Sequence, residues 1–190
     1  AGVHEGAGIG GFDEPGAQAA VERPRLGTHD ERVEVPPAAA VGEHLELRRL
    51  QGHTGDDLVL LDHSTGVLFA GGLVFAERVP TTPHADPAQW LHTLDLLAQW
   101  QRQGQFKQLV PSHGPVDQGL QGIAQTRDWL RWLTGWMQDS AQQGLDLSEL
   151  LRMPVPERFA GWAAQPAELH RSLAQWYPAY ERRALLPAQP

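Results

Sequence analysis

The sequence predicts a mixed α/β fold, and three observations support this prediction. Short apolar runs at 58–61, 67–70 and 106–110 have the length and the flanking turn residues of strands. Residues 87–103 carry apolar side chains at three- and four-residue spacing, which is typical of an amphipathic helix. After residue 117 helical spacing dominates the chain. We therefore expect one modest domain, in which a strand, helix, strand unit is followed by further helices.

The first element with a clear pattern comes after residue 32. Residues 1–32 are rich in Gly and turn-forming residues, and we predict an irregular or flexible segment there. Residues 6–11 fit the pattern G-x-G-x-x-G, but no apolar strand precedes them and turn chemistry follows, so we reject dinucleotide binding. Order is expected from Val33. A half-exposed strand is predicted within 41–51, where leucines nearly alternate with polar residues.

The apolar runs at 58–61 and 67–70 are predicted to pair as a hairpin. Residues 62–66, with the sequence DHSTG, form a polar turn between them that ends in Gly. His63 lies in this turn, and we interpret it as an exposed turn residue rather than a ligand.

The central helix has clear start and stop signals. Asp86 followed by Pro87 supplies an N-cap and a first-turn proline, and Gly104 ends the helix. The strand at 106–110 then places the sequence PSHGP at its carboxyl end. Binding sites in α/β layers tend to lie at such strand ends.

Three helical segments are predicted in the last third of the chain, at 118–143, 148–152 and 166–186, the last bent or interrupted at Pro178. Five of the seven tryptophans follow residue 116. An aromatic stripe at helical spacing is usually core or a helix interface, so we do not read it as a cofactor site. Its excess suggests that these Trp-rich helices form a homo-oligomer contact.

Composition excludes several classes of function. A formal charge of -8 with only 15 Lys and Arg argues against nucleic-acid binding, which needs a basic surface. No apolar run approaches the ~20 residues that span a bilayer, and the first residues lack a basic, then apolar, signal pattern. The chain has no Cys, so any zinc site must use His, Asp or Glu.

Two histidines are candidate metal ligands. His53 lies in GHTGDD before the run at 58–61, and His113 lies in PSHGP after the run at 106–110. Neutral imidazole is a good zinc ligand. Asp56 and Asp57 follow His53 and can either orient its imidazole or make a turn hydrogen bond, and the turn role is the simpler interpretation. No Ser-His-Asp nucleophile arrangement is recognisable, so no catalytic residue is assigned.

The order GHT, then a small-residue turn after an apolar strand, then SHGP resembles the second half of the metallo-β-lactamase fold. From residue 62 to 116 the chain, including the stretch TTPHADPAQW, looks like the quinoprotein relay system zinc metallohydrolases, a branch of that superfamily. PERF at 156–159 and the segment 170–181 resemble the helical extension that ends such proteins. The resemblance covers about 33–186.

This resemblance implies the second half of an αβ/βα sandwich at 33–116 with a helical carboxyl-terminal extension at 117–190. It further implies zinc-dependent hydrolysis of a small-molecule substrate, with His53 and His113 among the ligands of one or two zinc ions and a metal-bound hydroxide as the nucleophile. A periplasmic or secreted location is implied in the same way.

Two departures from the family pattern bear on activity. The superfamily's His-x-His-x-Asp-His motif is absent from the sequence, and Gly72 stands at the position of the acidic residue that bridges two metals. We therefore expect the carboxyl-terminal portion of a longer protein. The alternatives are a non-catalytic binding or assembly module, and a fragment that complements a separate amino-terminal half. Substrate, metal count and oligomeric state stay open.

His84, in the loop before the central helix, is a further candidate. Its loop leaves the predicted sheet on the side of His53 and His113, so His84 can contact substrate or act as an additional ligand. A hydrogen-bonding role at the helix start, beside the Asp86 cap, is the simpler interpretation.

Overall fold

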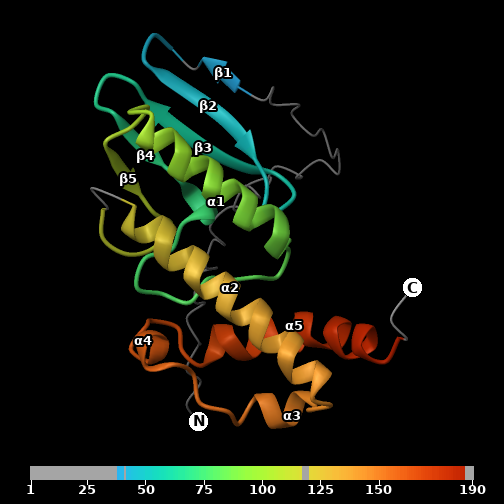
Figure 1. Cartoon of the computed structure of the whole chain (residues 1–190). Helices are drawn as coiled ribbons and strands as arrows, with labels where there is room; N and C mark the ends of the chain where they lie inside the picture. The colour runs from blue at the N-terminus through green and yellow to red at the C-terminus, as the bar shows by residue number, and fades with distance from the viewer. Residues whose placement is uncertain (1–37, 41, 117–119, 187–190) are drawn as a thin grey trace, which may run out of the picture. The chain divides into compact units, whose positions relative to one another are not determined.

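The computed structural model describes residues 38–40, 42–116 and 120–186, all within one compact unit, Glu34–Pro190 (Figure 1). The segment 1–32, predicted to be irregular, lies outside the described residues. The described strands are β1 (Ala38–Ala40), β2 (Leu45–Leu50), β3 (Asp57–Asp62), β4 (Val67–Phe69) and β5 (Gln108–Val110). The helices are η1 (Gly71–Leu73), α1 (Pro87–Arg102), α2 (Gln121–Gln142), α3 (Leu147–Leu150), α4 (Glu157–Ala160) and α5 (Ala167–Ala184). The α/β fold class is confirmed.

The five described strands form one sheet in the order β1-β2-β3-β4-β5. The first four strands are antiparallel, whereas β4 and β5 are parallel. The predicted hairpin is therefore β3–β4, and the predicted strand, helix, strand unit is β4–α1–β5. Both predictions are confirmed, since parallel neighbours require a crossover and α1 supplies it.

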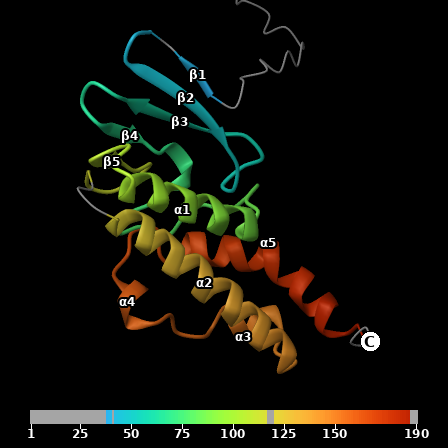
Figure 2. The ribbon, with the colours of Figure 1, turned by 45° about the horizontal axis from the view of Figure 1, so that its top comes forward.

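The sheet has helices on one side only among the described elements. Figures 1 and 2 show α1 and α2 on the same side of it. Val59, Leu61, Leu68 and Leu109 are fully buried and belong to the main core, which α1 and α2 share. Because side chains alternate along a strand, the strand residues that lie next to these buried ones in the sequence point to the opposite face of the sheet. That face, called the open face below, carries seven apolar residues, Leu45, Leu47, Leu58, Leu60, Val67, Phe69 and Val110, together with the polar residues Arg49, Asp62 and Gln108.

The open face is mostly apolar, and two of its side chains are exposed. Leu58 is 45% exposed and Phe69 is 43% exposed, although each lies on an inner strand of the sheet. A sheet face built from such residues usually packs against a second layer.

Helix α1 begins as predicted. The Asp86 carboxylate accepts hydrogen bonds from the backbone N–H groups of Ala88 and Gln89, and Pro87 occupies the first turn. Trp90 in that turn is fully buried, and its indole N–H donates to the Leu73 carbonyl over 2.9 Å. The helix is thereby attached to the segment that follows β4.

The carboxyl-terminal helices pack on α1 through α2, and α5 packs on α2 (Figure 2). Helix α4 was not predicted. Of the two predicted outcomes at Pro178, a bend or an interruption, the interruption does not occur: α5 runs through this residue, although proline removes one backbone hydrogen bond there. None of the described helices is both long and apolar enough to cross a membrane.

The tryptophans of this region pack within the chain. Trp129, buried on α2, contacts the rings of Trp132, Phe159 and Trp162 at centroid distances of 5.0, 5.0 and 5.8 Å. Trp132 stacks on Trp136. The expected core role is confirmed, and the expected homo-oligomer contact stays a prediction.

One buried hydroxyl joins α2 to the segment after β4. Thr126 Oγ1 accepts a hydrogen bond from the Phe75 backbone N–H (3.0 Å), and it lies 2.9 Å from the carbonyl oxygens of Phe75 and Gly122. We predict that Thr126→Val lowers the free energy of unfolding by about 1–3 kcal/mol, because it leaves the buried N–H of Phe75 without a partner. Urea denaturation measures this.

Thr134→Val is the matched control for that experiment. Its hydroxyl, on the same helix, bonds the Leu130 carbonyl within α2 and is only partly buried. An equal loss of stability in the two variants would contradict the role assigned to Thr126.

Candidate metal site

The loop that carries His53 rests on the start of α1. Gly52 has φ +147°, and a Cβ atom there would lie 2.5 Å from Trp90 Cα, so only glycine fits. The Gly52 carbonyl accepts a hydrogen bond from the Asp86 N–H over 2.9 Å. The residue before His53 is therefore fixed by the helix cap.

The His53 imidazole is held from several sides. Its ring lies 5.2 Å from Trp90 in an edge-on contact and 5.8 Å from Phe75, centroid to centroid. Nε2 lies 3.1 Å from Thr81 Oγ1, and Nδ1 lies 3.6 Å from an oxygen of Asp57. One fifth of the side chain is exposed, 20%. Both ring nitrogens thus face polar protein atoms.

Asp57 is a buried carboxylate at the start of β3. It accepts hydrogen bonds from the Thr54 backbone N–H (3.0 Å) and the Thr54 hydroxyl (2.9 Å), which close the loop around His53. Burial raises the pKa of Asp57, but the interactions with His53 and Thr54 outweigh burial and hold this pKa below its ordinary value. Asp57 therefore combines the turn role with a position beside the imidazole.

Asp56 has a different environment from Asp57. Its carboxylate accepts a hydrogen bond from Arg49 Nε over 2.6 Å and is exposed. It lies in the same loop as Asp57, but its carboxylate pairs with Arg49, whereas that of Asp57 lies beside His53.

The His113 loop is attached to the segment after β4. The Ser112 N–H donates to the Val74 carbonyl (2.8 Å), and the Ala76 N–H donates to the His113 carbonyl (2.9 Å). Gly114 has φ +102°, and a Cβ atom there would lie 2.7 Å from Ala76 Cβ. His113 is exposed, and its ring lies 5.6 Å from that of Phe75.

Phe75 is therefore the common neighbour of the two candidate ligands. It is almost fully buried, 1% exposed, and it contacts both imidazole rings. Sequence reasoning missed the roles of Phe75 and Thr81, because both contacts join residues distant in the chain, although Thr81 opens the stretch TTPHADPAQW. The structure brings the His53 and His113 loops to one edge of the sheet.

Gly72 lies directly against His53. A Cβ atom at position 72 would lie 2.7 Å from His53 Cε1, so the imidazole occupies the room that a side chain would need. An acidic residue at position 72 and the observed position of His53 are mutually exclusive.

The donors match zinc in kind but not in number. His53, His113 and Asp57 are residue types that zinc accepts. However, within the described part of the chain no group of three or more His, Cys, Asp or Glu side chains is arranged to hold a metal ion. The described residues alone do not make a complete zinc site.

His84 is exposed in a turn on the side of α5. In the same loop the Pro83 carbonyl accepts a hydrogen bond from the Gln175 side chain, and Thr82 Oγ1 lies 2.8 Å from Ser172 Oγ. Thr81, from this loop, reaches His53. The substrate or ligand role of His84 stays a prediction.

Comparisons with known proteins give structural neighbours only. No protein-family model matches the chain, and no curated protein matches its sequence. The chain is similar to a metallo-β-lactamase from Pontibacter korlensis, with 30% identity over 52% of this chain and 46% of that one and a TM-score of 0.43. It is also similar to the metallo-β-lactamase FIM-1 from Pseudomonas aeruginosa in its mono-zinc form, with 28% identity over 50% and 42% of the two chains and a TM-score of 0.43. The chain spans less than half the length of these structures.

We predict that Gly72→Ala lowers the free energy of unfolding by about 1–3 kcal/mol, because the new methyl group overpacks the His53 ring. Gly55→Ala, in the His53 loop, is the control: a Cβ atom there meets nothing within 4 Å. Urea denaturation and the NMR shifts of the His53 ring report stability and ring position. Equal stability of the two variants, with an unmoved imidazole, would contradict this packing.

Proposed function

We propose that this chain supplies one half of a metallo-β-lactamase-type zinc hydrolase centre, in which His53 and His113 are zinc ligands and the remaining ligands come from outside the described residues. The observation that carries the proposal is the convergence of the two histidine loops on Phe75 at one sheet edge. The quinoprotein relay system branch, a small-molecule substrate and a periplasmic location belong to the same proposal.

Bound zinc would lower the pKa of a water molecule and so provide a nucleophile at neutral pH. The residues described here would position the ligands. Asp57 lies beside His53 Nδ1, where a carboxylate fixes the tautomer and the orientation of a ligating imidazole. Binding through Nε2 would replace the contact of that nitrogen with Thr81 Oγ1.

The open face supports the idea of a half site. Its apolar residues would pack against a second sheet, and that sheet would bring the missing ligands to the edge where His53 and His113 lie. A sandwich of two packed sheets would bury the side chains of Leu58 and Phe69, which are 45% and 43% exposed in this chain.

A second candidate is a non-catalytic binding or assembly module. It is favoured by one observation, the position of the His53 ring in the space that an acidic side chain at residue 72 would need. In that case the histidine loops serve packing only.

Zinc content distinguishes the two candidates. We expect the protein expressed from its intact gene to retain zinc after dialysis. His53→Ala and His113→Ala should each weaken zinc binding at least ~100-fold, more than the loss of a residue that only hydrogen-bonds to a ligand would. His92→Ala, which removes an exposed histidine on α1, is the control and retains zinc. Elemental analysis measures the metal. Zinc bound equally by all four proteins would overturn the assignment of ligands, and a zinc-free wild type would favour the module.

Substitution on the open face tests the second sheet separately. Phe69→Lys is expected to reduce stability in the intact-gene protein by more than about 2 kcal/mol, because a charge would enter an apolar interface. In the isolated 190-residue chain the effect should be small, since the ring is already partly exposed. Leu185→Lys, at a residue that is 84% exposed, is the control. Equal effects of Phe69→Lys in the two proteins would argue against docking at this face.

A further inference from the structure

A cavity of about 450 Å³ lies at the other end of the sheet, between the β3–β4 turn and the loop from α1 to β5. Its walls are Arg48, His63, Ser64, Thr65, Gly66, Gly104, Gln105, Phe106 and Lys107. No carboxylate is among these lining residues, although Glu46 and Asp62 hydrogen-bond side chains that are. The volume is in the range of pockets for small organic ligands.

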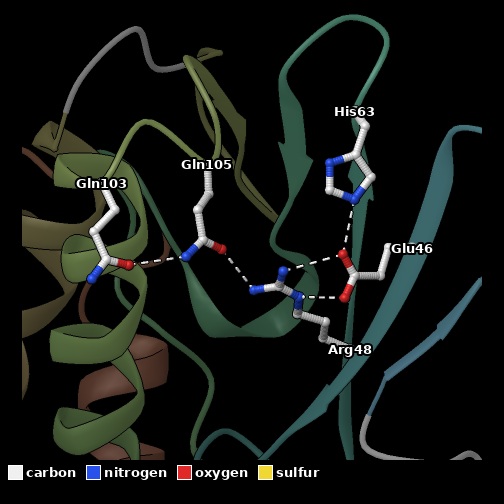
Figure 3. Close-up of polar contacts among 5 residues, drawn as sticks. All are labelled: Glu46, Arg48, His63, Gln103 and Gln105. Carbon is white, nitrogen blue, oxygen red and sulfur yellow. Dashed lines mark hydrogen bonds and ion pairs between the residues drawn. The ribbon is translucent and has the colours of Figure 1, made fainter.

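Arg48 is fixed in the cavity wall (Figure 3). Its Nε and one terminal nitrogen donate to the two oxygens of Glu46 at 2.8 and 3.1 Å, and the other terminal nitrogen donates to Gln105 Oε1 at 2.8 Å. The guanidinium also lies 4.2 Å from the centroid of the Trp100 ring. These contacts use three of its five N–H groups, so N–H donors remain for a ligand.

Glu46 neither lines the cavity nor leaves its charge unpaired. Its carboxylate binds Arg48 on one side and His63 Nε2, at 2.8 Å, on the other. The hydrogen bond from Arg48 is the main cause that holds the pKa of Glu46 below its ordinary value, against the opposing effect of burial. The acid therefore orients the two basic side chains.

Lys107 is the only lysine in the chain. Its backbone N–H donates to the Gly66 carbonyl over 2.7 Å, and its aliphatic stem lies along Gly66, with Cγ 3.6 Å from the place where a Cβ atom would be. The side chain is exposed, and within the described structure no carboxylate pairs with its ammonium. It contributes a free positive charge to the cavity.

The β3–β4 turn supplies the cavity with hydrogen-bond acceptors as well. The hydroxyls of Ser64 and Thr65 donate to Asp62, at 2.6 and 2.7 Å, and these hydrogen bonds lower the pKa of Asp62 to about 2. The Asp62 carboxylate is therefore ionised and accepts a hydrogen bond from each of the two hydroxyls. The two hydroxyl oxygens can accept hydrogen bonds from hydroxyl groups of a ligand.

We propose that this cavity binds a small phosphate monoester with hydroxyl groups, with its phosphate on Arg48 and Lys107. A guanidinium fork and an ammonium are the cationic groups that phosphate prefers. The six residues of β3 separate the cavity from the His53 loop by about 20 Å, from the rise of ~3.3 Å per residue, so this site is distinct from the candidate metal site.

Calorimetric titration with glycerol 3-phosphate and inorganic phosphate, at constant ionic strength, tests the proposal. We expect saturable binding of glycerol 3-phosphate that Lys107→Gln and Arg48→Lys each weaken about tenfold, as loss of a charge-assisted hydrogen bond does. Arg131→Gln, which removes an exposed charge on α2, is the control and leaves affinity unchanged. Circular dichroism verifies that every variant is folded.

Amine acylation supplies an independent measurement, because Lys107 carries the only side-chain amine; peptide mass spectrometry separates its modification from that of the α-amino group. Glycerol 3-phosphate should slow acylation of Lys107 in the wild type and in Arg131→Gln. Heat changes that do not saturate, affinities that are equal in wild type and Lys107→Gln, or acylation unaffected by the ligand would each overturn the proposal. Tighter binding of succinate than of glycerol 3-phosphate would overturn the phosphate class.

Discussion

The packing of Trp90 is the interaction on which the rest of the sheet edge depends. Its backbone touches Gly52, its indole N–H binds the Leu73 carbonyl, and its ring contacts His53 and Phe75. One side chain therefore joins the first turn of α1 to both the loop before β3 and the segment after β4. Because Trp90 is fully buried, none of these three parts can move without opening the core.

The segment after β4, residues 74–76, connects this packing to the His113 loop. Val74 and Ala76 hold the His113 loop through backbone hydrogen bonds, and Thr126 from α2 holds Phe75 between them. The orientation of His113 thus depends on a helix that begins after it in the chain. This dependence explains why the helical third of the chain and the sheet form a single core.

Local patterns predicted the fold well, and they predicted the candidate site in part. The hairpin turn at 62–66 and the Asp86 cap depend on residues within a few positions, so the sequence was enough to find them. Phe75 and Thr81 reach His53 only after the chain has folded, and no spacing rule predicts such contacts. Helices α3 and α4 each have four residues, too few for a periodic signal, and α4 also lacks the side-chain cap that Asp146 gives α3.

The two ends of β3 place different electrostatic demands on the sheet. At the His53 end the neighbours are the rings of Phe75 and Trp90 and the buried carboxylate of Asp57. Burying a metal ion there costs free energy, so tight binding would need ligands in addition to His53. At the hairpin end, the Glu46 carboxylate bonds Arg48 and His63 and the Asp62 carboxylate bonds two hydroxyls, whereas the exposed ammonium of Lys107 has no carboxylate partner among the described residues. An anion is the simplest ligand for a cavity lined by an ammonium and a guanidinium, since each contact then pairs opposite charges. The two ends of β3 therefore differ in the side chains that they offer to a ligand: imidazoles and one carboxylate at one end, cationic groups and hydroxyls at the other.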